Sequence, residues 1–278
     1  MATQYQKFLE FAKQLALKAG NVLIENRGKP LKVKQKGNKD YATNVDLMVE
    51  RMIVADIKKE FPDHSIVGEE LGSTSPSTSN ASKQIPHSNK TSQFTWYIDP
   101  LDGTKNYFNG MSLFAVSIAL VNKNIPIIAV VYNPFLNELF YAVKGEGAYL
   151  NENGVEKRIT IAKKKEFEEC ILASNPGYTR SKYDSLFYRS VARKVSTVRI
   201  LGSAAMDLCY IACGRLDIYM NSRSSPWDFV AGVLIAEEAG AIVTTSRNVD
   251  LPLKETDLIA SNNVLHDKVL KIANIIVH

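Results

Sequence analysis

Residues 96–104 read Trp-Tyr-Ile-Asp-Pro-Leu-Asp-Gly-Thr, and this stretch says more about the fold than any other part of the chain. An apolar run leads directly into two carboxylates, Asp99 and Asp102, which are separated by two residues. The apolar residues predict a strand, and a strand end exposes both carboxylates together. Pro100 stiffens the turn that we expect there, so both aspartates and the main-chain carbonyl of Leu101 can converge on one point.

The chemistry of this stretch is typical of a metal site beside a phosphate site. Hard oxygen ligands such as carboxylates and carbonyls suit Mg²⁺ or Mn²⁺, and not zinc. Gly103 allows backbone N–H groups to approach a phosphate closely, and Thr104 adds a hydroxyl beside the metal. An acidic turn that only caps a following helix would explain each aspartate separately, but not the combination after an apolar strand.

The chain before this stretch predicts two amphipathic helices. Apolar residues recur at helical spacing over residues 8–23 and again over residues 45–57. The second helix ends at Pro62 and begins beside Asn44, a residue type that favours helix caps. Asp46 therefore lies in the first turn of that helix.

Residues 65–93 combine a short strand with a polar segment. The strand at 65–67 is followed by Gly68-Glu69-Glu70, and two adjacent carboxylates taken alone are usual on a solvated surface. Residues 72–93 are rich in Ser, Thr, Asn, Lys and Pro, which predicts a mobile loop. A lid over a site is the functional interpretation of this loop.

The chain from residue 94 onward predicts first a sheet and then alternating elements. Apolar runs between residues 94 and 143, separated by turn residues, indicate an antiparallel sheet. Beyond Cys170, strand and helix patterns alternate, as in an α/β unit. We expect an N-terminal α+β lobe over 1–150, a C-terminal α/β lobe over 151–278, and a site in the cleft between them.

A further carboxylate, Asp228, follows Ser225-Pro226-Trp227 and opens the apolar helical run at 230–239. A carboxylate in a first helical turn is a good cap, because it faces unpaired backbone N–H groups. It is also well placed to bind a metal. From the residues alone, capping and metal ligation are equal alternatives for Asp228.

Composition excludes several classes of protein. The 278 residues, 45% of them hydrophobic, can bury a sizeable core, and no run of about 18 apolar residues indicates a membrane span. The N-terminal residues lack the apolar run of a signal peptide, so we expect a cytoplasmic protein. Three cysteines do not indicate a disulfide framework. A net charge of +5 is only a weak indication of an anionic partner, and we expect neither a nucleic-acid nor a membrane partner.

Other hydrolase and kinase classes do not fit the motifs. A haloacid-dehalogenase-type phosphatase needs two aspartates separated by one residue, whereas two residues separate this pair. No Gly-x-x-x-x-Gly-Lys-Ser/Thr sequence occurs, which argues against a P-loop kinase. The four histidines lie near none of the motifs, which argues against a zinc hydrolase.

Five motifs of the chain resemble, in the same order, those of the inositol monophosphatase family of magnesium-dependent, lithium-sensitive phosphatases. The resemblance covers nearly the whole chain, and the order of five motifs makes coincidence improbable. The motifs are Ala42-Thr43-Asn44-Val45-Asp46, Gly68-Glu69-Glu70, Asp99-Pro100-Leu101-Asp102-Gly103-Thr104, Gly202-Ser203-Ala204-Ala205 and Pro226-Trp227-Asp228-Phe229-Val230-Ala231-Gly232. The family fold implies a layered αβαβα sandwich that combines α+β and α/β lobes.

The resemblance also implies roles for individual residues. Two or three Mg²⁺ ions, for which Mn²⁺ is a possible substitute, would activate a water molecule that attacks the phosphate of a small phosphorylated substrate. Glu70 would also orient or deprotonate that water, with support from Asp46 and Thr104. Lys36 would add a distant positive charge. The implied metal ligands are Glu70, Asp99, the carbonyl of Leu101, Asp102 and Asp228, and the implied substrate-binding residues are Gly103, Thr104, Gly202, Ser203 and Ala204.

The chain departs from many family members at Asn221, where they have a glutamate that binds inositol hydroxyls. An amide still forms hydrogen bonds with hydroxyls but brings no charge. The expected substrate is myo-inositol 1-phosphate, with fructose 1,6-bisphosphate, NADP and 3′-phosphoadenosine 5′-phosphate as alternatives. The resemblance further implies a homodimer and inhibition by lithium.

A non-catalytic metal- or phosphate-binding regulatory protein on the same scaffold is the alternative from another functional class, because a fold does not determine a function. The complete carboxylate set argues against it, since clustered carboxylates are costly without a cation. Metal-dependent hydrolysis of a phosphate ester distinguishes the two.

Overall fold

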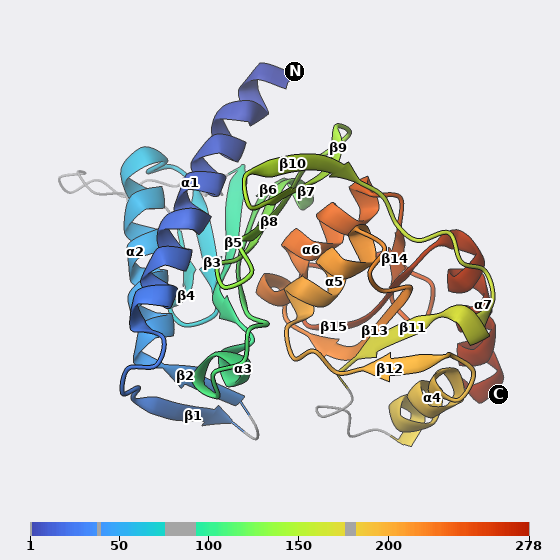
Figure 1. Ribbon diagram of the computed structural model, residues 1–278. Helices are drawn as coiled ribbons and strands as arrows, with labels where there is room; N and C mark the ends of the chain where they lie inside the picture. The colour runs from blue at the N-terminus through green and yellow to red at the C-terminus, as the bar shows by residue number, and fades with distance from the viewer. Residues whose placement is uncertain (1, 38–39, 76–92, 176–181, 278) are drawn as a thin grey trace, which may run out of the picture.

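Layers of helices and sheets alternate through the molecule (Figure 1). The computed structural model describes residues 2–37, 40–75, 93–175 and 182–277. Two helices, an eight-stranded sheet, two helices, a five-stranded sheet and two further helices follow one another across the structure. The predicted αβαβα sandwich is therefore confirmed.

The eight-stranded sheet has the strand order β10-β9-β8-β7-β6-β5-β3-β4. All neighbouring strands are antiparallel except β3 and β5, which are parallel. The antiparallel sheet predicted between residues 94 and 143 is thereby confirmed. The strands are β3 (Ser65–Gly68), β4 (Gly72–Thr74), β5 (Phe94–Asp102), β6 (Ala115–Asn122), β7 (Ile125–Asn133), β8 (Glu138–Val143), β9 (Gly147–Glu152) and β10 (Val155–Ile159).

The five-stranded sheet has the order β12-β11-β13-β15-β14. Strand β11 is parallel to both of its neighbours, whereas β15 is antiparallel to both of its own. The strands are β11 (Ile171–Ser174), β12 (Thr197–Arg199), β13 (Ile218–Ser224), β14 (Ile242–Thr244) and β15 (Thr256–Ser261).

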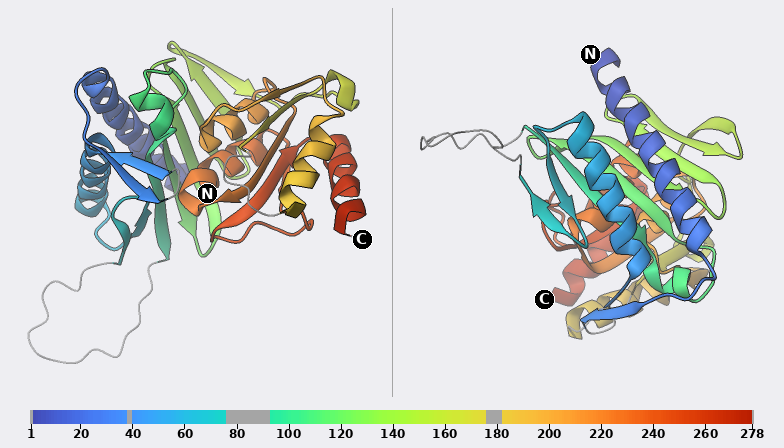
Figure 2. Two further views of the ribbon diagram at one scale, coloured as in Figure 1. Left: turned by 90° about the horizontal axis from the view of Figure 1, so that it is seen from below. Right: turned by 90° about the vertical axis from the view of Figure 1, so that its left-hand side faces the viewer.

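In the described part of the chain, six long helices cover the faces of the two sheets, and Figure 2 shows α1 and α2 side by side on the outer face of the larger one. Helices α5 and α6 lie between the sheets, and α4 and α7 cover the outer face of the smaller sheet. The helices are α1 (Ala2–Asn26), α2 (Asn44–Glu60), α4 (Lys182–Ala192), α5 (Ala204–Ala212), α6 (Pro226–Glu238) and α7 (Asn263–Val277). The remaining elements are β1 (Val33–Gly37), β2 (Asp40–Thr43), α3 (Thr104–Phe108) and the 3₁₀ turn η1 (Phe167–Glu169).

The central strands are buried on both faces, which explains why they read as continuous apolar runs. In β6, Ile118 packs in the cluster beneath α1 and α2, whereas its neighbour Ala119 packs in the cluster around α5 and α6. Both side chains are fully buried. The sheet therefore forms the boundary between two hydrophobic cores.

The start of α2 differs from the sequence prediction by one residue. Thr43, and not Asn44, is the N-cap. The Thr43 hydroxyl accepts from the N–H of Val45 at 3.1 Å, and the Asp46 carboxylate accepts from the N–H of Thr43 at 2.9 Å. The side chain of Asn44 instead accepts from the N–H of Lys32 at 2.8 Å, which ties α2 to the segment before β1.

Strand β5 does not end before Pro100, as the sequence suggested, but continues to Asp102. Asp99 lies opposite Ser117 and Asp102 lies opposite Ala115, so the β5 side of the ladder contains one residue more. A bulge of this kind accommodates a proline, which has no N–H to give to the ladder. The two aspartates converge through this bulge and not through a turn.

The other boundary predictions have mixed outcomes. The loop predicted over 72–93 is wrong at its start, because residues 72–74 form β4, and its residues 76–92 lie outside the described residues. The predicted lobe boundary at residue 150 falls inside β9, and the larger sheet continues to β10, so the division into lobes stays a prediction.

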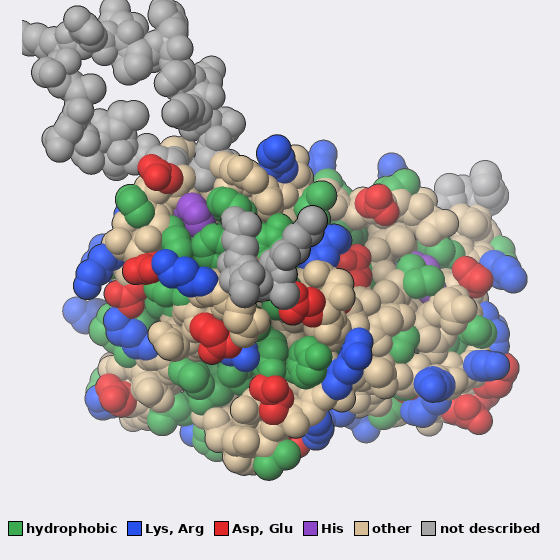
Figure 3. All heavy atoms as spheres, turned by 90° about the horizontal axis from the view of Figure 1, so that it is seen from above, with side chains coloured by type: hydrophobic (Ala, Val, Ile, Leu, Met, Phe, Trp, Pro, Cys, Tyr) green, Lys and Arg blue, Asp and Glu red, His purple; other side chains and the backbone are tan. Residues whose placement is uncertain are grey.

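None of the helices in the described ranges is both long and apolar enough to cross a membrane. On the face seen in Figure 3, basic and acidic side chains are interspersed, and the basic ones do not gather in one stripe.

Candidate active site

Three aspartates meet where the bulge of β5 approaches the N-termini of the two central helices. Asp99 and Asp102 come from β5, and Asp228 comes from the first turn of α6. The exposed fractions of Asp99 and Asp102 are only 2% and 9%, and Asp228 is partly buried. The structure thus brings together three of the four predicted carboxylate ligands.

Asp102 is tied to the start of α5. One carboxylate oxygen accepts from the hydroxyl of Ser203 at 2.6 Å and from the N–H of Ala205 at 2.7 Å. These bonds link the end of β5 to a segment about one hundred residues later in the chain, so the aspartate sits where a helix N-terminus favours negative charge.

Asp228 caps α6, which confirms one of the two alternatives derived from sequence. Its Oδ2 accepts from the N–H of Ser225 at 2.9 Å in a capping box. Capping does not preclude ligation, because a carboxylate has a second oxygen and further lone pairs. Asp99 is held in a similar way, since its Oδ1 accepts from the N–H of Leu101 at 2.9 Å.

The aspartates destabilise one another's charged forms. Burial, followed by the charges of Glu69, Asp102 and Asp228, raises the pKa of Asp99 well above its ordinary value. Burial, followed by the charges of Asp102 and Glu69, does the same to the pKa of Asp228. Burial raises the pKa of Asp102 to about 6, although the hydrogen bonds from Ser203 and Ala205 act in the opposite direction. A bound cation would remove this repulsion.

The fourth carboxylate whose charge reaches the cluster is that of Glu69. It is a cause of the raised pKa of both Asp99 and Asp228, whereas Glu70 is not among the main causes of either shift. The N–H of Glu69 donates to the carbonyl of Ile98 at 3.3 Å, which holds Glu69 beside the end of β5. The N–H of Glu70 donates to the carboxylate of Glu50 at 2.7 Å.

Glu50 is a residue of this site that the sequence analysis missed. Its side chain is fully buried, and its two carboxylate oxygens accept from the N–H groups of Glu70 and Leu71 at 2.7 and 2.9 Å. Glu50 therefore fixes the turn that carries Glu69. The available signal was its spacing of four from Asp46, which places both carboxylates on the core-facing stripe of α2.

Asp46 and Thr104 form the predicted pair. The Thr104 hydroxyl lies 3.0 Å from Oδ1 of Asp46 and 3.0 Å from the carbonyl oxygen of Leu101. Burial raises the pKa of Asp46, and hydrogen bonds from Thr43 and Thr104 oppose that rise. The pair therefore adjoins the carbonyl that was predicted to bind metal.

The predicted substrate-binding turn at 202–204 precedes α5. Gly202 and Ala204 are partly buried, whereas only 2% of Ser203 is exposed. Ser203 is the N-cap of α5, and its hydroxyl donates to Asp102. The structure thus assigns Ser203 a clear part in holding Asp102, and its contact with substrate stays a prediction.

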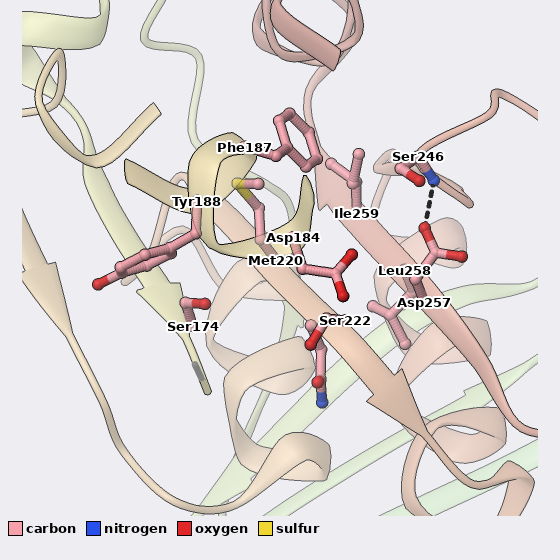
Figure 4. A pocket seen from close by; sticks show the side chains of 11 residues that line it. Ser174, Asp184, Phe187, Tyr188, Met220, Ser222, Ser246, Asp257, Leu258 and Ile259 are labelled. Atoms are coloured by element: carbon pink, nitrogen blue, oxygen red, sulfur yellow. Dashed lines mark hydrogen bonds between the residues drawn. The ribbon is translucent and has the colours of Figure 1, made fainter. Parts of the chain in front are cut away.

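Asn221 lies in β13 and is also largely buried. Its Nδ2 donates to the hydroxyl of Tyr219 at 3.0 Å, and its Oδ1 accepts from the N–H of Arg223 at 3.2 Å. Asn221 lines a hollow between α4, β13 and β15 that also contains the carboxylates of Asp184 and Asp257 (Figure 4). Among the residues that the structure describes, none of the side chains lining this hollow is a lysine or an arginine.

The donor set fits a hard divalent cation by its chemistry. Within the described ranges, no three acidic, histidine or cysteine side chains already stand in a ligating arrangement. The aspartates nevertheless lie close enough to raise one another's pKa, and carboxylate and carbonyl oxygens are the ligands that Mg²⁺ prefers. Lys36 lies in β1, and its predicted electrostatic role stays a prediction.

The chain is similar to known proteins in sequence and in fold. The model of the inositol monophosphatase family matches residues 4–278. A fructose-1,6-bisphosphatase/inositol-1-monophosphatase of Aquifex aeolicus is 39% identical over 275 residues, which cover 96% of each chain. The Nus factor SuhB of Haemophilus influenzae is 40% identical over 240 residues, or 84% of each chain. The crystal structure of the extragenic suppressor protein SuhB of Bartonella henselae superposes with a TM-score of 0.86 at 31% identity, over 96% of this chain and 98% of that one.

The resemblance seen in five short motifs thus extends over the whole chain and its fold. The match to the family confirms the expectation of a phosphatase, and members of this family generally depend on metal ions. The chain belongs to the inositol monophosphatase family.

Proposed function

We propose that this protein is a Mg²⁺-dependent phosphomonoesterase that hydrolyses myo-inositol 1-phosphate with water as the nucleophile. The observation that most supports the proposal is the acidic cluster, in which burial and mutual repulsion raise the pKa of Asp99 and Asp228. Because carboxylates gathered in this way are costly without a cation, their retention favours a metal-bound state.

Asp99, Asp102, Asp228 and the carbonyl of Leu101 would hold about two or three Mg²⁺ ions, with Mn²⁺ as a substitute. When bound, the metal neutralises phosphoryl charge and makes water more acidic. Glu69 takes the ligand role that the sequence analysis gave to Glu70, because the charge of Glu69 acts on the aspartates.

The Asp46–Thr104 pair would orient the attacking water. The Thr104 hydroxyl has its proton directed to Asp46 or to the Leu101 carbonyl, at 3.0 Å in each case. Its oxygen is then left as an acceptor, which can fix one proton of a water molecule. The carboxylate of Glu69, whose charge acts on Asp99 and Asp228, is the candidate base that receives the proton of this water.

The substrate would lie between two turns of the backbone. Gly103 and Thr104 would hold the phosphate, and Gly202, Ala204 and Asn221 would contact the alcohol. The family to which the chain belongs is named for inositol monophosphatase, and the Asn221 amide can form hydrogen bonds with the hydroxyls of a polyol. This favours inositol 1-phosphate over fructose 1,6-bisphosphate, NADP and 3′-phosphoadenosine 5′-phosphate.

Fructose 1,6-bisphosphate is the second candidate substrate. The Aquifex aeolicus relative carries both activities in its name and covers nearly the whole chain. The catalytic cluster would be the same for both esters, and only the alcohol side of the site would decide between them.

The test is phosphate release from these four esters, with Mg²⁺ and with a chelator. We expect Mg²⁺-dependent hydrolysis with the highest kcat/KM on inositol 1-phosphate. A preference for a bisphosphate would keep the mechanism and refute the substrate assignment. No activity on any ester would refute the enzymatic proposal and favour a non-catalytic metal- or phosphate-binding role.

Glu69→Gln and Glu70→Gln form a matched pair of variants for the ligand assignment. We expect Glu69→Gln to lower kcat by about 100-fold or more and to raise the Mg²⁺ concentration for half-activation, with a much smaller effect of Glu70→Gln. The reverse order of effects would restore the original prediction for Glu70.

We further propose a cytoplasmic homodimer. Light scattering should give twice the mass of one chain, and fractionation of the source cells should recover the protein with the cytoplasmic fraction. A monomeric mass at micromolar concentration would contradict the oligomeric state.

A further inference from the structure

The side chain of Asn106 joins the two turns between which the substrate would lie. Asn106 follows Gly103 and Thr104 in the short helix α3, and only 7% of its surface is exposed. Its amide nitrogen donates to the carbonyl of Leu113 at 2.6 Å and to the carbonyl of Leu201 at 2.7 Å. Both protons of one amide group are therefore used on two separate segments.

These two segments come from different parts of the chain. Leu113 precedes β6 in the larger sheet, whereas Leu201 is 95 residues from Asn106 and directly precedes Gly202. The Leu201 bond thus anchors the turn at 202–204 to the helix that begins at Thr104. Apart from this bond, the hydrogen bonds of Asp102 to Ser203 and Ala205 connect the same two regions.

The backbone around Asn106 is packed without spare room. Gly202 has a φ of +79°, and a Cβ there would lie 3.2 Å from both polar atoms of the Asn106 amide. Gly103 has a φ of +91°, and a Cβ there would lie 3.0 Å from the Leu113 carbonyl oxygen and 3.3 Å from that of Gly202. Two glycines therefore allow the turns to touch, and Asn106 fixes how they touch.

We propose that Asn106 is a positioning residue that sets the separation between the phosphate-holding turn at 103–104 and the alcohol-contacting turn at 202–204. It acts through the Leu201 carbonyl and is not required to touch metal or phosphate. This inference rests on the proposed function, because it assumes that one substrate spans both turns. Only a side chain with two donors can satisfy both carbonyls, and an isosteric carboxylate would face them with acceptors alone.

If Asn106 sets this separation, its substitution should affect a large substrate more than a small one. An ester with a polyhydroxy alcohol needs both turns at the right distance, whereas phenyl phosphate needs the phosphate turn and the metal ligands only. Asn106→Asp should therefore lower kcat/KM for inositol 1-phosphate, or for whichever panel ester the wild type prefers, by about tenfold to 100-fold. The same variant should change kcat/KM for phenyl phosphate by less than about threefold.

Asn109→Asp is the matched control variant. Asn109 ends the same helix, and its amide donates to the carbonyl of Lys105 at 2.8 Å at an exposed position, without contact to the 202–204 turn. This variant should affect both substrates equally and slightly. If Asn106→Asp does not fold by circular dichroism, Asn106→Ser retains one donor and serves in its place.

An equal loss of activity on both substrates would overturn the positioning role and indicate a purely structural one, while leaving the proposed function intact. An Asn106→Asp enzyme with wild-type activity on both would overturn it as well. A wild type that hydrolyses none of the esters would overturn the proposed function and this inference together.

Discussion

Removal of divalent metal should leave the protein with a pH-dependent loss of stability that originates at Asp102. Burial raises the pKa of Asp102 from its ordinary 3.8 to about 6, so the folded state holds this proton more tightly than the unfolded state. The contribution of Asp102 to stability is therefore complete below pH 3.8 and is lost as the pH rises through about 6. A difference of about two pH units, at about 1.36 kcal/mol each, corresponds to about 3 kcal/mol.

Urea unfolding of the wild type and of Asp102→Asn, both in chelator, measures this contribution. Groups remote from the cluster titrate equally in the two proteins, so the difference between their free energies of unfolding reports Asp102 together with its effect on the pKa of Asp99 and Asp228. We expect the wild type to lose about 3 kcal/mol relative to the variant between about pH 4 and pH 7. Mg²⁺ at about 100 times its Kd should then restore about 2.7 kcal/mol to the wild type and little to the variant. A difference that stays constant with pH would refute the reasoning.

Asp99→Asn should lower phosphate release by at least about 100-fold at saturating Mg²⁺ with an unchanged circular dichroism spectrum, and appreciable residual activity would contradict its role as a ligand. Glu50→Ala should destabilise the protein by roughly 3 kcal/mol or more in urea unfolding, because the N–H groups of Glu70 and Leu71 lose a charged acceptor that is itself fully buried. Glu60→Ala, at an exposed position on the same helix, should change little, and equal effects of the two would show that Glu50 is not special. The resemblance to the family also predicts that lithium inhibits the enzyme, and a Mg²⁺-activated enzyme indifferent to lithium would not belong to the inositol-type subgroup.

Local pattern sufficed for much of the fold. Helices such as α1 and α2, and strands such as β7 and β8, carry apolar residues at the spacing of their own secondary structure, and the predicted ranges are close to the observed ones. Strand β15 and helix α7 were not predicted, and β9 and β10 were not separated from the turns around them. The exposed residues of β10, such as Val155 and Lys157, do not alternate in burial, so a sequence pattern does not reveal it.

The site residues could likewise be predicted where the signal is local in sequence, and not where their partners are distant. Asp99, Asp102 and the Thr104 hydroxyl could be identified because they follow one apolar strand within a few residues, and Asp228 because it opens a helix. Glu50 was missed because a carboxylate inside an apolar stripe has no partner nearby in sequence. Its partners, Glu70 and Leu71, are about twenty residues away.

By itself, the sequence determined the type of chemistry: the carboxylates, the glycine turns and their order along the chain already indicated a metal-dependent phosphatase of this family. Only the tertiary structure shows that the charge of Glu69 reaches the aspartates, because the Glu69 N–H donates to the carbonyl of Ile98 at the end of β5 and Glu50 holds the turn that follows. It likewise decided that Asp102 meets Ser203 and that Asn106 meets Leu201. Contacts between segments about one hundred residues apart arise from the packing of α5 between two sheets, and no local pattern encodes that distance.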